Sequence, residues 1–172
     1  MVNAEKVKSI RAKAHANENN SGCSQAVLAA LQEELGIGDV QSLKAATAFA
    51  GGMARRGESC GALVAALMGL GLEEGREKLE DTPKLQATVV DGITLSEEFM
   101  RRIEKEWRMK KPLPSTLCRD MQKAIYGKSW NLADPAQRTD FINSGGHGDS
   151  GCLKVCGIAA EVAAEMILQK RG

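Results

Sequence analysis

Apolar residues recur every three or four positions along most of the chain, which is the spacing of an amphipathic α-helix. The same spacing appears in residues 3–16, 21–35, 40–49, 115–125 and 135–142. In residues 152–170 the apolar positions form one stripe, made up of Cys152, Val155, Cys156, Ala159, Val162, Ala163, Met166 and Ile167. No segment shows the sustained alternation expected of a strand. The pattern predicts an all-α fold, a single compact helical bundle-like domain of about six to eight helices over residues 1–172.

Two neighbouring segments differ from this amphipathic pattern. Residues 60–72 are apolar on all sides, which predicts a central buried helix. Residues 73–111 are rich in charge, and we expect mostly a solvated face there, with Val89 and Val90 in a loop. Within this stretch Thr94 and Glu97 form a capping-box pattern, which predicts that a helix begins there and ends before Pro112.

Composition removes several classes of function. The chain has 172 residues, a formal net charge of +1 and only 3% aromatic residues, so it lacks the basic stripe and stacking residues expected of a nucleic-acid binder. Residues 1–20 contain no apolar core of the kind a secretory signal needs. The longest uncharged stretch, residues 61–72, is too short to span a bilayer. We therefore expect a cytoplasmic protein that binds neither nucleic acid nor membrane.

The five cysteines carry the candidate chemistry. Four of them follow a Ser or Thr that is a plausible helix N-cap: Cys23 after Ser21, Cys60 after Ser59, Cys118 after Ser115 and Thr116, and Cys152 after Ser150. Unpaired N–H groups and the helix dipole favour thiolate over thiol at such positions. Thiolate is both a nucleophile and a metal ligand, so four converging sites suit a metal–thiolate centre, to whose field Arg55 and Arg56 would add.

A plainer interpretation treats these cysteines as small buried residues that fill the core. Cys156 fits that interpretation best, because it lies one turn deeper on an apolar stripe, although ligation stays open. Zinc ligands usually occur in closely spaced pairs, and only Cys152 and Cys156 have that spacing.

His147 lies in the Gly-rich stretch that precedes Cys152. It could act as a base for Cys152 or as a metal ligand, but a solvated loop histidine is the favoured interpretation, as it is for His15. Residues 146–151 also match G-x-G-x-x-G, a pattern that requires a preceding strand to indicate dinucleotide binding. No such strand is expected here, so we interpret these glycines as a flexible approach to Cys152.

From about Asn20 onward the chain resembles the family of redox-active proteins named for the C_GCAxxG_C_C cysteine pattern. The resemblance rests on GCSQAVLAALQEELGI, FAGGMARRGESCGALVAALMGLGL, STLCRDM and CLKVCGIAAEVAAEMI. The four cysteines of the pattern fall on Cys23, Cys60, Cys118 and Cys152. Ala65 replaces the closing glycine of the central motif, and Cys156 is additional.

The resemblance implies redox activity associated with anaerobic bacterial metabolism and with iron–sulfur centres. We expect Cys23, Cys60, Cys118 and Cys152 to bind an iron–sulfur cluster, with Cys156 as a less certain metal ligand, for electron transfer or redox sensing with an oxidoreductase partner. A thiol–disulfide oxidoreductase and a zinc-stabilised helical interaction module are the alternatives. Whether the chain is an enzyme stays open, and a homodimer is possible through the Ala- and Gly-rich helix or the segment from Phe99 to Trp107.

Overall fold

Eight α-helices make up most of the computed structural model, which describes residues 3–20 and 22–172. They are α1 (Ala4–Asn17), α2 (Cys23–Leu35), α3 (Val40–Ala45), α4 (Gly61–Glu74), α5 (Thr82–Glu106), α6 (Cys118–Tyr126), α7 (Pro135–Asn143) and α8 (Cys152–Arg171), with 3-10 turns η1 (Glu18–Asn20) and η2 (Thr47–Phe49). These described residues form no β-strand, and a single isolated antiparallel bridge joins Ser59 to Leu117. The predicted all-α fold is therefore confirmed.

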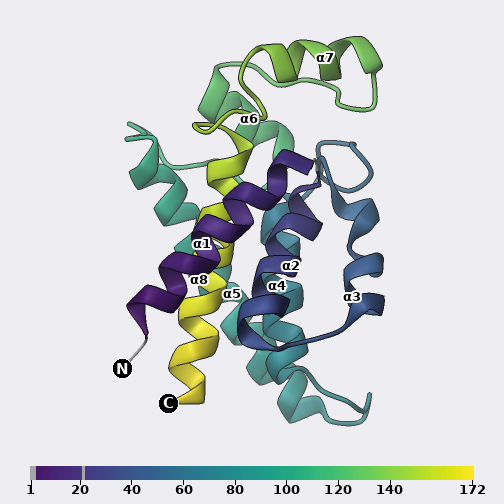
Figure 1. The fold of residues 1–172 in the computed structure, drawn as a ribbon, viewed down its shortest axis with the longest axis vertical. Helices are drawn as coiled ribbons and strands as arrows, with labels where there is room; N and C mark the ends of the chain where they lie inside the picture. Colours follow the sequence, from purple (N-terminus) through teal and green to yellow (C-terminus); the bar gives the residue numbers. More distant parts are fainter. Residues whose placement is uncertain (1–2, 21) are drawn as a thin grey trace.

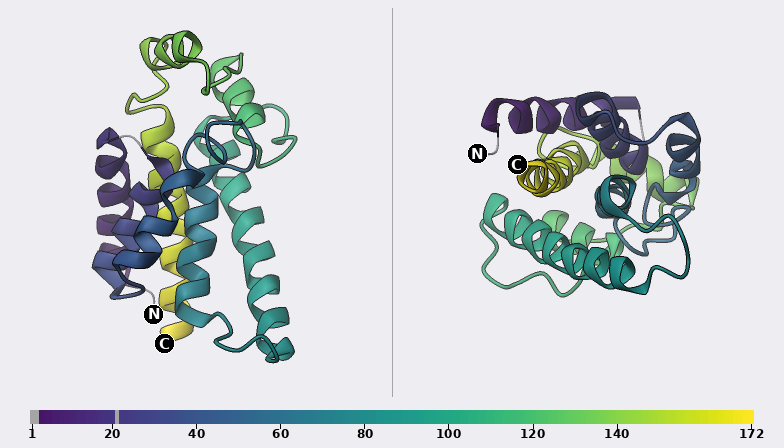
Figure 2. Two further views of the ribbon diagram at one scale, coloured as in Figure 1. Left: turned by 90° about the vertical axis from the view of Figure 1, so that its right-hand side faces the viewer. Right: turned by 90° about the horizontal axis from the view of Figure 1, so that it is seen from below.

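Helix α8 runs through a bundle made with α1, α2, α4 and α5, and it packs against all four (Figures 1 and 2). Its predicted apolar stripe is buried, with Cys156, Ala159 and Ala163 fully enclosed. Helix α4, predicted to be the central one, packs against α2, α5 and α8 but leaves Leu72 at 39% exposure. Helix α8 thus contacts more of the bundle than α4 does.

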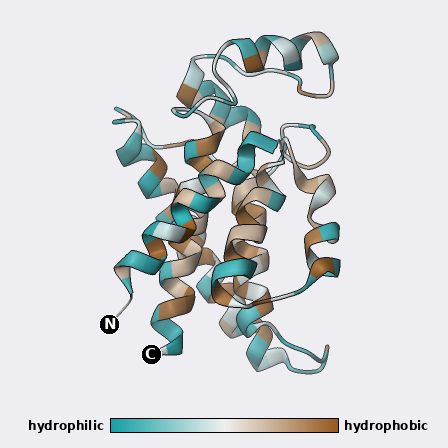
Figure 3. Cartoon of the chain, viewed as in Figure 1, coloured by the Kyte–Doolittle hydropathy of each residue, from teal (hydrophilic) through white to brown (hydrophobic). Residues whose placement is uncertain are grey.

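The outer helices have the amphipathic character that their sequences predict. In α1 the buried side chains are Val7, Ile10 and Ala14, and the remaining positions are mostly polar, as the hydropathy colours show (Figure 3). Helix α2 ends at Gly36, whose φ of 67° gives the left-handed cap that favours glycine. Within the described part of the chain, no helix combines the length and apolar character needed to cross a membrane.

The predicted loop at Val89 and Val90 is wrong, because both residues lie inside α5. This helix begins at Thr82, where the side chain of Asp81 accepts a hydrogen bond from the backbone N–H of Lys84 at 3.0 Å. The hydroxyl of Thr94 does not cap a helix but donates to the carbonyl of Val90 one turn earlier, at 3.2 Å. An earlier cap and continuous backbone bonding therefore override the low helix propensity of the two valines.

The second half of α5 packs into the core. Leu95, Phe99 and Ile103 are fully buried, which makes Phe99 and Ile103 part of the bundle and leaves them unavailable for a contact between two copies.

Helices α6 and α7 lie across one end of the bundle (Figures 1 and 2). A small second cluster holds this end together, formed by buried Trp130, Leu132 and Phe141 with Tyr126 and Cys152 packed against it. Trp130 and Phe141 meet edge to face, with ring centroids 5.3 Å apart. The cluster covers the start of α8, so it encloses the place where Cys152 lies.

Candidate functional site

Four cysteines lie at the starts of four different helices. Cys23, Cys118 and Cys152 are the first residues of α2, α6 and α8, and Cys60 is the N-cap of α4. The predicted hydroxyl caps are wrong for the described residues, because the N-cap positions hold Gly22, Cys60, Leu117 and Gly151, and none makes a side-chain capping bond. Ser21, the cap predicted for α2, lies outside the described residues. The N–H groups of the first turns are therefore left available to the sulfurs.

These helix starts meet around one cavity of about 320 Å³, and all five cysteines line it: Cys23, Cys60, Cys118, Cys152 and Cys156. The thiols are close enough to affect one another electrostatically. Charge on Cys60 raises the pKa of Cys23, charge on Cys118 raises the pKa of Cys60, and charge on Cys23 raises the pKa of Cys118. All five are free thiols. Residues far apart in the sequence thus share one site.

The bridge between Ser59 and Leu117 sets the relation between two of the cysteines. The backbone N–H of Cys60 donates to the carbonyl of Thr116 at 2.9 Å, and that of Cys118 donates to the carbonyl of Glu58 at 2.7 Å. Each cysteine follows a bridged residue, so both point to the same face. In a diagonal pair of this kind the two Cα atoms lie about 7–8 Å apart. A disulfide requires Cα atoms within about 7 Å of each other. The bridge holds the two thiols near each other but not paired.

A left-handed turn joins η2 to the bridge. Residues 51–55 all have φ between 54° and 72°, and three of them, Met53, Ala54 and Arg55, are not glycine. Each such residue costs roughly 1–2 kcal/mol in this conformation. Backbone bonds compensate, including one from the N–H of Ala54 to the carbonyl of Ala48 at 2.7 Å. Beyond Gly51 and Gly52 no residue pattern indicates this turn, because Met, Ala and Arg rarely adopt a positive φ.

Two glycines of the central motif allow the close approach of backbone to cysteine. A Cβ atom on Gly61 would lie 2.6 Å from the Sγ of Cys23, and one on Gly52 would lie 2.6 Å from the Cβ of Cys118. Gly52 also has a φ of 72°. Side chains at these positions would displace the cysteines, so the glycines are part of the site.

Several groups donate hydrogen bonds to the sulfurs. The backbone N–H groups of Gly51 and Ser24 bond to Cys23 and lower the pKa of its thiol, and those of Leu63 and Ala62 do the same for Cys60. This is the helix-start effect that the sequence predicts. Two side chains that sequence reasoning missed also contribute: the amide of Gln122 donates to Cys118 at 3.4 Å, and the hydroxyl of Tyr126 lies 3.9 Å from the sulfur of Cys152.

Burial nevertheless outweighs these donors in the free protein. It raises the pKa of Cys60 and of Cys118 to about 12, and it raises the pKa values of Cys23, Cys152 and Cys156 as well. The prediction that the helix starts favour thiolate is therefore wrong for the unliganded thiols, which stay protonated at neutral pH. A positively charged ligand would have to supply the missing stabilisation.

A buried carboxylic acid faces the same cavity. Glu18 is only 2% exposed, and one of its oxygens accepts a hydrogen bond from the N–H of Gly22 at 3.1 Å. Burial raises the pKa of Glu18 to about 7. Its other oxygen lies 3.5 Å from Nδ1 of His147. Nothing in the sequence marked Glu18, which lies in an ordinary polar turn.

Both histidines have contacts that the sequence did not reveal. His147 lies in the predicted loop, but its side chain is only 27% exposed and lines the cavity, so it is less solvated than expected. Burial lowers the pKa of His147, which keeps it neutral at pH 7. His15 bonds to Asp149 at 3.0 Å through Nε2. The two contacts attach the Gly-rich loop before Cys152 to α1 and η1.

Positive charge lies on the wall of the cavity. Arg55 and Arg138 both line it, whereas Arg56, which was expected to contribute with Arg55, does not. In the described ranges, neither Arg55 nor Arg138 forms an ion pair. The two guanidinium groups would offset negative charge within the site.

The potential metal-binding side chains of the site do not converge on a single point. No group of three or more Cys, His, Asp or Glu side chains in the described ranges is placed to hold one metal ion. The extra thiol, Cys156, is fully buried and donates towards the carbonyl of Cys23 at 3.8 Å. The cysteine sulfurs therefore line the cavity without meeting at one position that a single metal ion could occupy.

Comparisons with known proteins agree with the cysteine arrangement. No curated protein and no solved structure matches the chain. The profile of one protein family, described as "Putative redox-active protein (C_GCAxxG_C_C)", matches residues 21–166 and so includes all of the cysteines. The chain belongs to this C_GCAxxG_C_C family of redox-active proteins.

Proposed function

We propose that the chain binds an iron–sulfur cluster through Cys23, Cys60, Cys118 and Cys152 and exchanges electrons with an oxidoreductase partner. The observation that carries this proposal is that four cysteines, each at the start of a different helix, surround one cavity. When bound, the cluster would supply reversible uptake and release of electrons. The protein would supply the ligands, the hydrogen bonds and the exclusion of water.

The cavity suits a group larger than one metal ion. Its volume of about 320 Å³ compares with roughly 30 Å³ for one water molecule in the liquid. A single tetrahedral zinc ion needs sulfurs about 2.3 Å from one common point, and the described residues offer no such set. A cluster would share its four cysteines among two or more iron atoms, so the sulfurs need not all meet at one point. This difference favours a cluster over zinc.

Local charge also suits a cluster. Thiolate ligation adds negative charge to a buried site, and backbone N–H donors such as those of Gly51, Ala62 and Leu63 already point at the sulfurs. Arg55 and Arg138 add positive charge at the wall. Because the free thiols have raised pKa values, ligation must release protons. We therefore expect cluster loading to weaken as the pH falls.

Thiol–disulfide exchange is a weaker proposal. The attacking group in that chemistry is a thiolate, and burial raises the pKa of every cysteine in the cavity. The bridge also separates Cys60 and Cys118 at about the limit for a disulfide. Cycling of these cysteines between dithiol and disulfide is therefore treated as a result that would contradict the cluster proposal.

Anaerobic purification followed by incubation with ferrous iron and sulfide tests the proposal. We expect a broad visible absorption that bleaches on reduction, with iron and sulfide bound in comparable amounts. A colourless, iron-free protein whose cysteines cycle between dithiol and disulfide would contradict it. Stoichiometric zinc with no redox response would contradict it in favour of an interaction module.

A further inference from the structure

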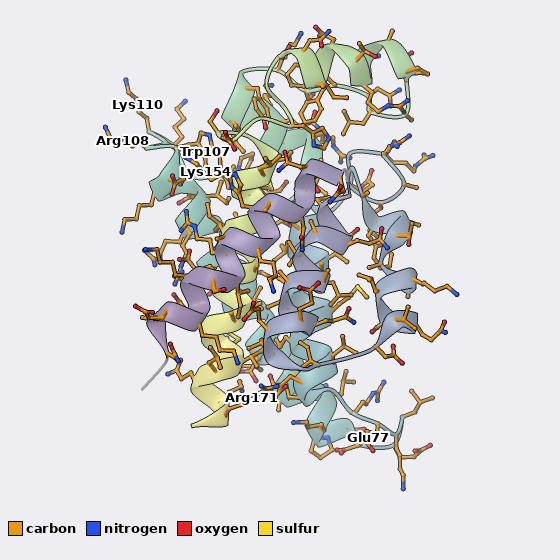
Figure 4. The ribbon with its side chains drawn as sticks, in the orientation of Figure 1. Glu77, Trp107, Arg108, Lys110, Lys154 and Arg171 are labelled. Atoms are coloured by element: carbon orange, nitrogen blue, oxygen red, sulfur yellow. The ribbon has the colours of Figure 1, made fainter. Side chains whose placement is uncertain are left out.

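A groove that combines basic and apolar residues lies beside the cysteine site. It has a volume of about 760 Å³ and lies between the segment after α5 and the outer side of α6. Its apolar part includes Trp107, Met109, Pro112 and Pro114, and its basic part includes Lys110 and Lys123. Figure 4 shows Arg108 and Lys110 extending outward at this side of the molecule, close to Trp107.

The charge here is unbalanced although the whole chain carries only +1. Three exposed lysines line the groove, Lys110, Lys111 and Lys123, and exposed Lys105 and Arg108 line a separate pocket nearby. None of them forms an ion pair with another described residue, whereas nearby Lys154 is paired with Glu106 at 3.0 Å. The acid in the groove, Asp120, accepts a hydrogen bond from Ser115 at 2.6 Å. The groove therefore presents three ammonium groups and one carboxylate to an approaching molecule, an excess of positive charge.

The mixture of apolar and basic residues in the groove indicates what kind of molecule would bind there. An apolar centre with a charged rim is the usual anatomy of a protein–protein interface, and aromatic and Met side chains are enriched in such centres. Half-buried Trp107 and Met109 supply the apolar centre, while the lysines supply the rim. A phosphate backbone would use the lysines but would leave the apolar centre unmatched. Complementarity thus favours an acidic protein surface that carries an apolar residue.

The groove is also close to the cysteine site. Helix α6 begins at Cys118, and its residues Lys123 and Ala124 line the groove. Five residues of helix span only about 7.5 Å along the axis. We propose that this groove is the docking surface for an acidic protein partner that exchanges electrons with the cysteine site. That the partner exchanges electrons rests on the proposed function, whereas its binding to this groove does not.

Binding of a fluorescein-labelled peptide of glutamates with a central Phe-Leu pair tests this proposal by fluorescence anisotropy at low salt. The variant pair is Lys110→Glu/Lys111→Glu, and the matched control is Lys44→Glu/Lys78→Glu, which changes the net charge equally at exposed lysines elsewhere. We expect the first pair to weaken binding by about tenfold or more and the control by less than about twofold. High salt should weaken the wild type most, and a peptide of glutamates alone should bind less tightly.

Three results would overturn the docking surface. They are no binding to the wild-type protein, equal loss in both variant pairs, or tighter binding of a single-stranded DNA oligonucleotide of the same charge. The groove contains none of the cysteines, so the peptide should bind before and after incubation with iron and sulfide. Failure of cluster loading with intact peptide binding would therefore contradict the proposed function alone.

Discussion

The side-chain amide of Gln122 donates a hydrogen bond to the Sγ atom of Cys118 at 3.4 Å. Gln122 is 3% exposed, and its carbonyl oxygen accepts from the backbone N–H of Trp130 at 2.8 Å. Because that N–H needs an acceptor, the amide must turn its NH₂ group towards the sulfur. A buried donor held in one orientation stabilises negative charge on the sulfur and should influence the redox site.

Replacing Gln122 by Met keeps the volume but removes both the donor to Cys118 and the acceptor of the Trp130 N–H, so urea unfolding is measured beside the potential to separate the loss of stability from the change at the sulfur. We expect the reduction potential of the loaded protein to fall by about 40 mV, which corresponds to about 1 kcal/mol for the loss of one hydrogen bond to the more negative state. A potentiometric titration checks this. Gln32→Met is the control, because the amide of Gln32 bonds to Asp39 and Ser42, away from the cysteines. An unchanged potential in Gln122→Met would show that the contact does not tune the site.

Gly61→Ala should damage the site, and Gly71→Ala in the same helix should not. The new Cβ at position 61 would lie 2.6 Å from the Sγ of Cys23 and 2.5 Å from the carbonyl oxygen of Phe49, whereas nothing lies within 4 Å at position 71. We expect Gly61→Ala to lose about 1–3 kcal/mol of unfolding free energy and much of its iron. Gly71→Ala should gain about 0.5–1 kcal/mol and keep its iron. Urea unfolding and iron analysis measure both, and equal effects at the two positions would contradict the close packing around Cys23.

Glu18 should make the iron-free protein less stable as the pH rises. Burial raises the pKa of this carboxyl to about 7, above its unfolded value near 4.5, so the folded state holds the proton more tightly. Stability is then highest below pH 4.5, falls between pH 4.5 and 7, and levels off above pH 7; the total loss is about 3 kcal/mol. Unfolding of the wild type and of Glu18→Gln from pH 5 to 8 measures this. The variant should lose the corresponding part of the pH dependence, and parallel curves would contradict the burial of Glu18.

The apolar pattern predicted most of the fold because helix faces are set by local spacing. The stripe on α8 and the end of α2 at Gly36 follow from the sequence directly, whereas the helix predicted over residues 40–49 ends at Ala45 and gives way to the 3-10 turn η2. The start of α5 does not, because the cap at Asp81 and the continuous backbone bonding of the helix outweigh the local preference of Val89 and Val90 for other structures.

The candidate site was predictable in its cysteines but not in its surroundings. Cysteine position relative to helix starts identified Cys23, Cys60, Cys118 and Cys152 without any distance information. Glu18, Gln122 and His147 reach the cavity only through tertiary packing between distant segments. The preference for thiolate was wrong for the same reason, since burial depends on the whole fold and exceeds the effect of local N–H groups.

We propose that the four helix-start cysteines, and not Cys156, hold one common redox group. Iron and sulfide content after anaerobic reconstitution, measured on five single Cys→Ser variants, tests it most directly, with circular dichroism to confirm folding. We expect that Ser at position 23, 60, 118 or 152 removes most of the bound iron and alters the visible spectrum, while Cys156→Ser keeps both. Full iron content in any of the four variants, or an equal loss in Cys156→Ser, would contradict it.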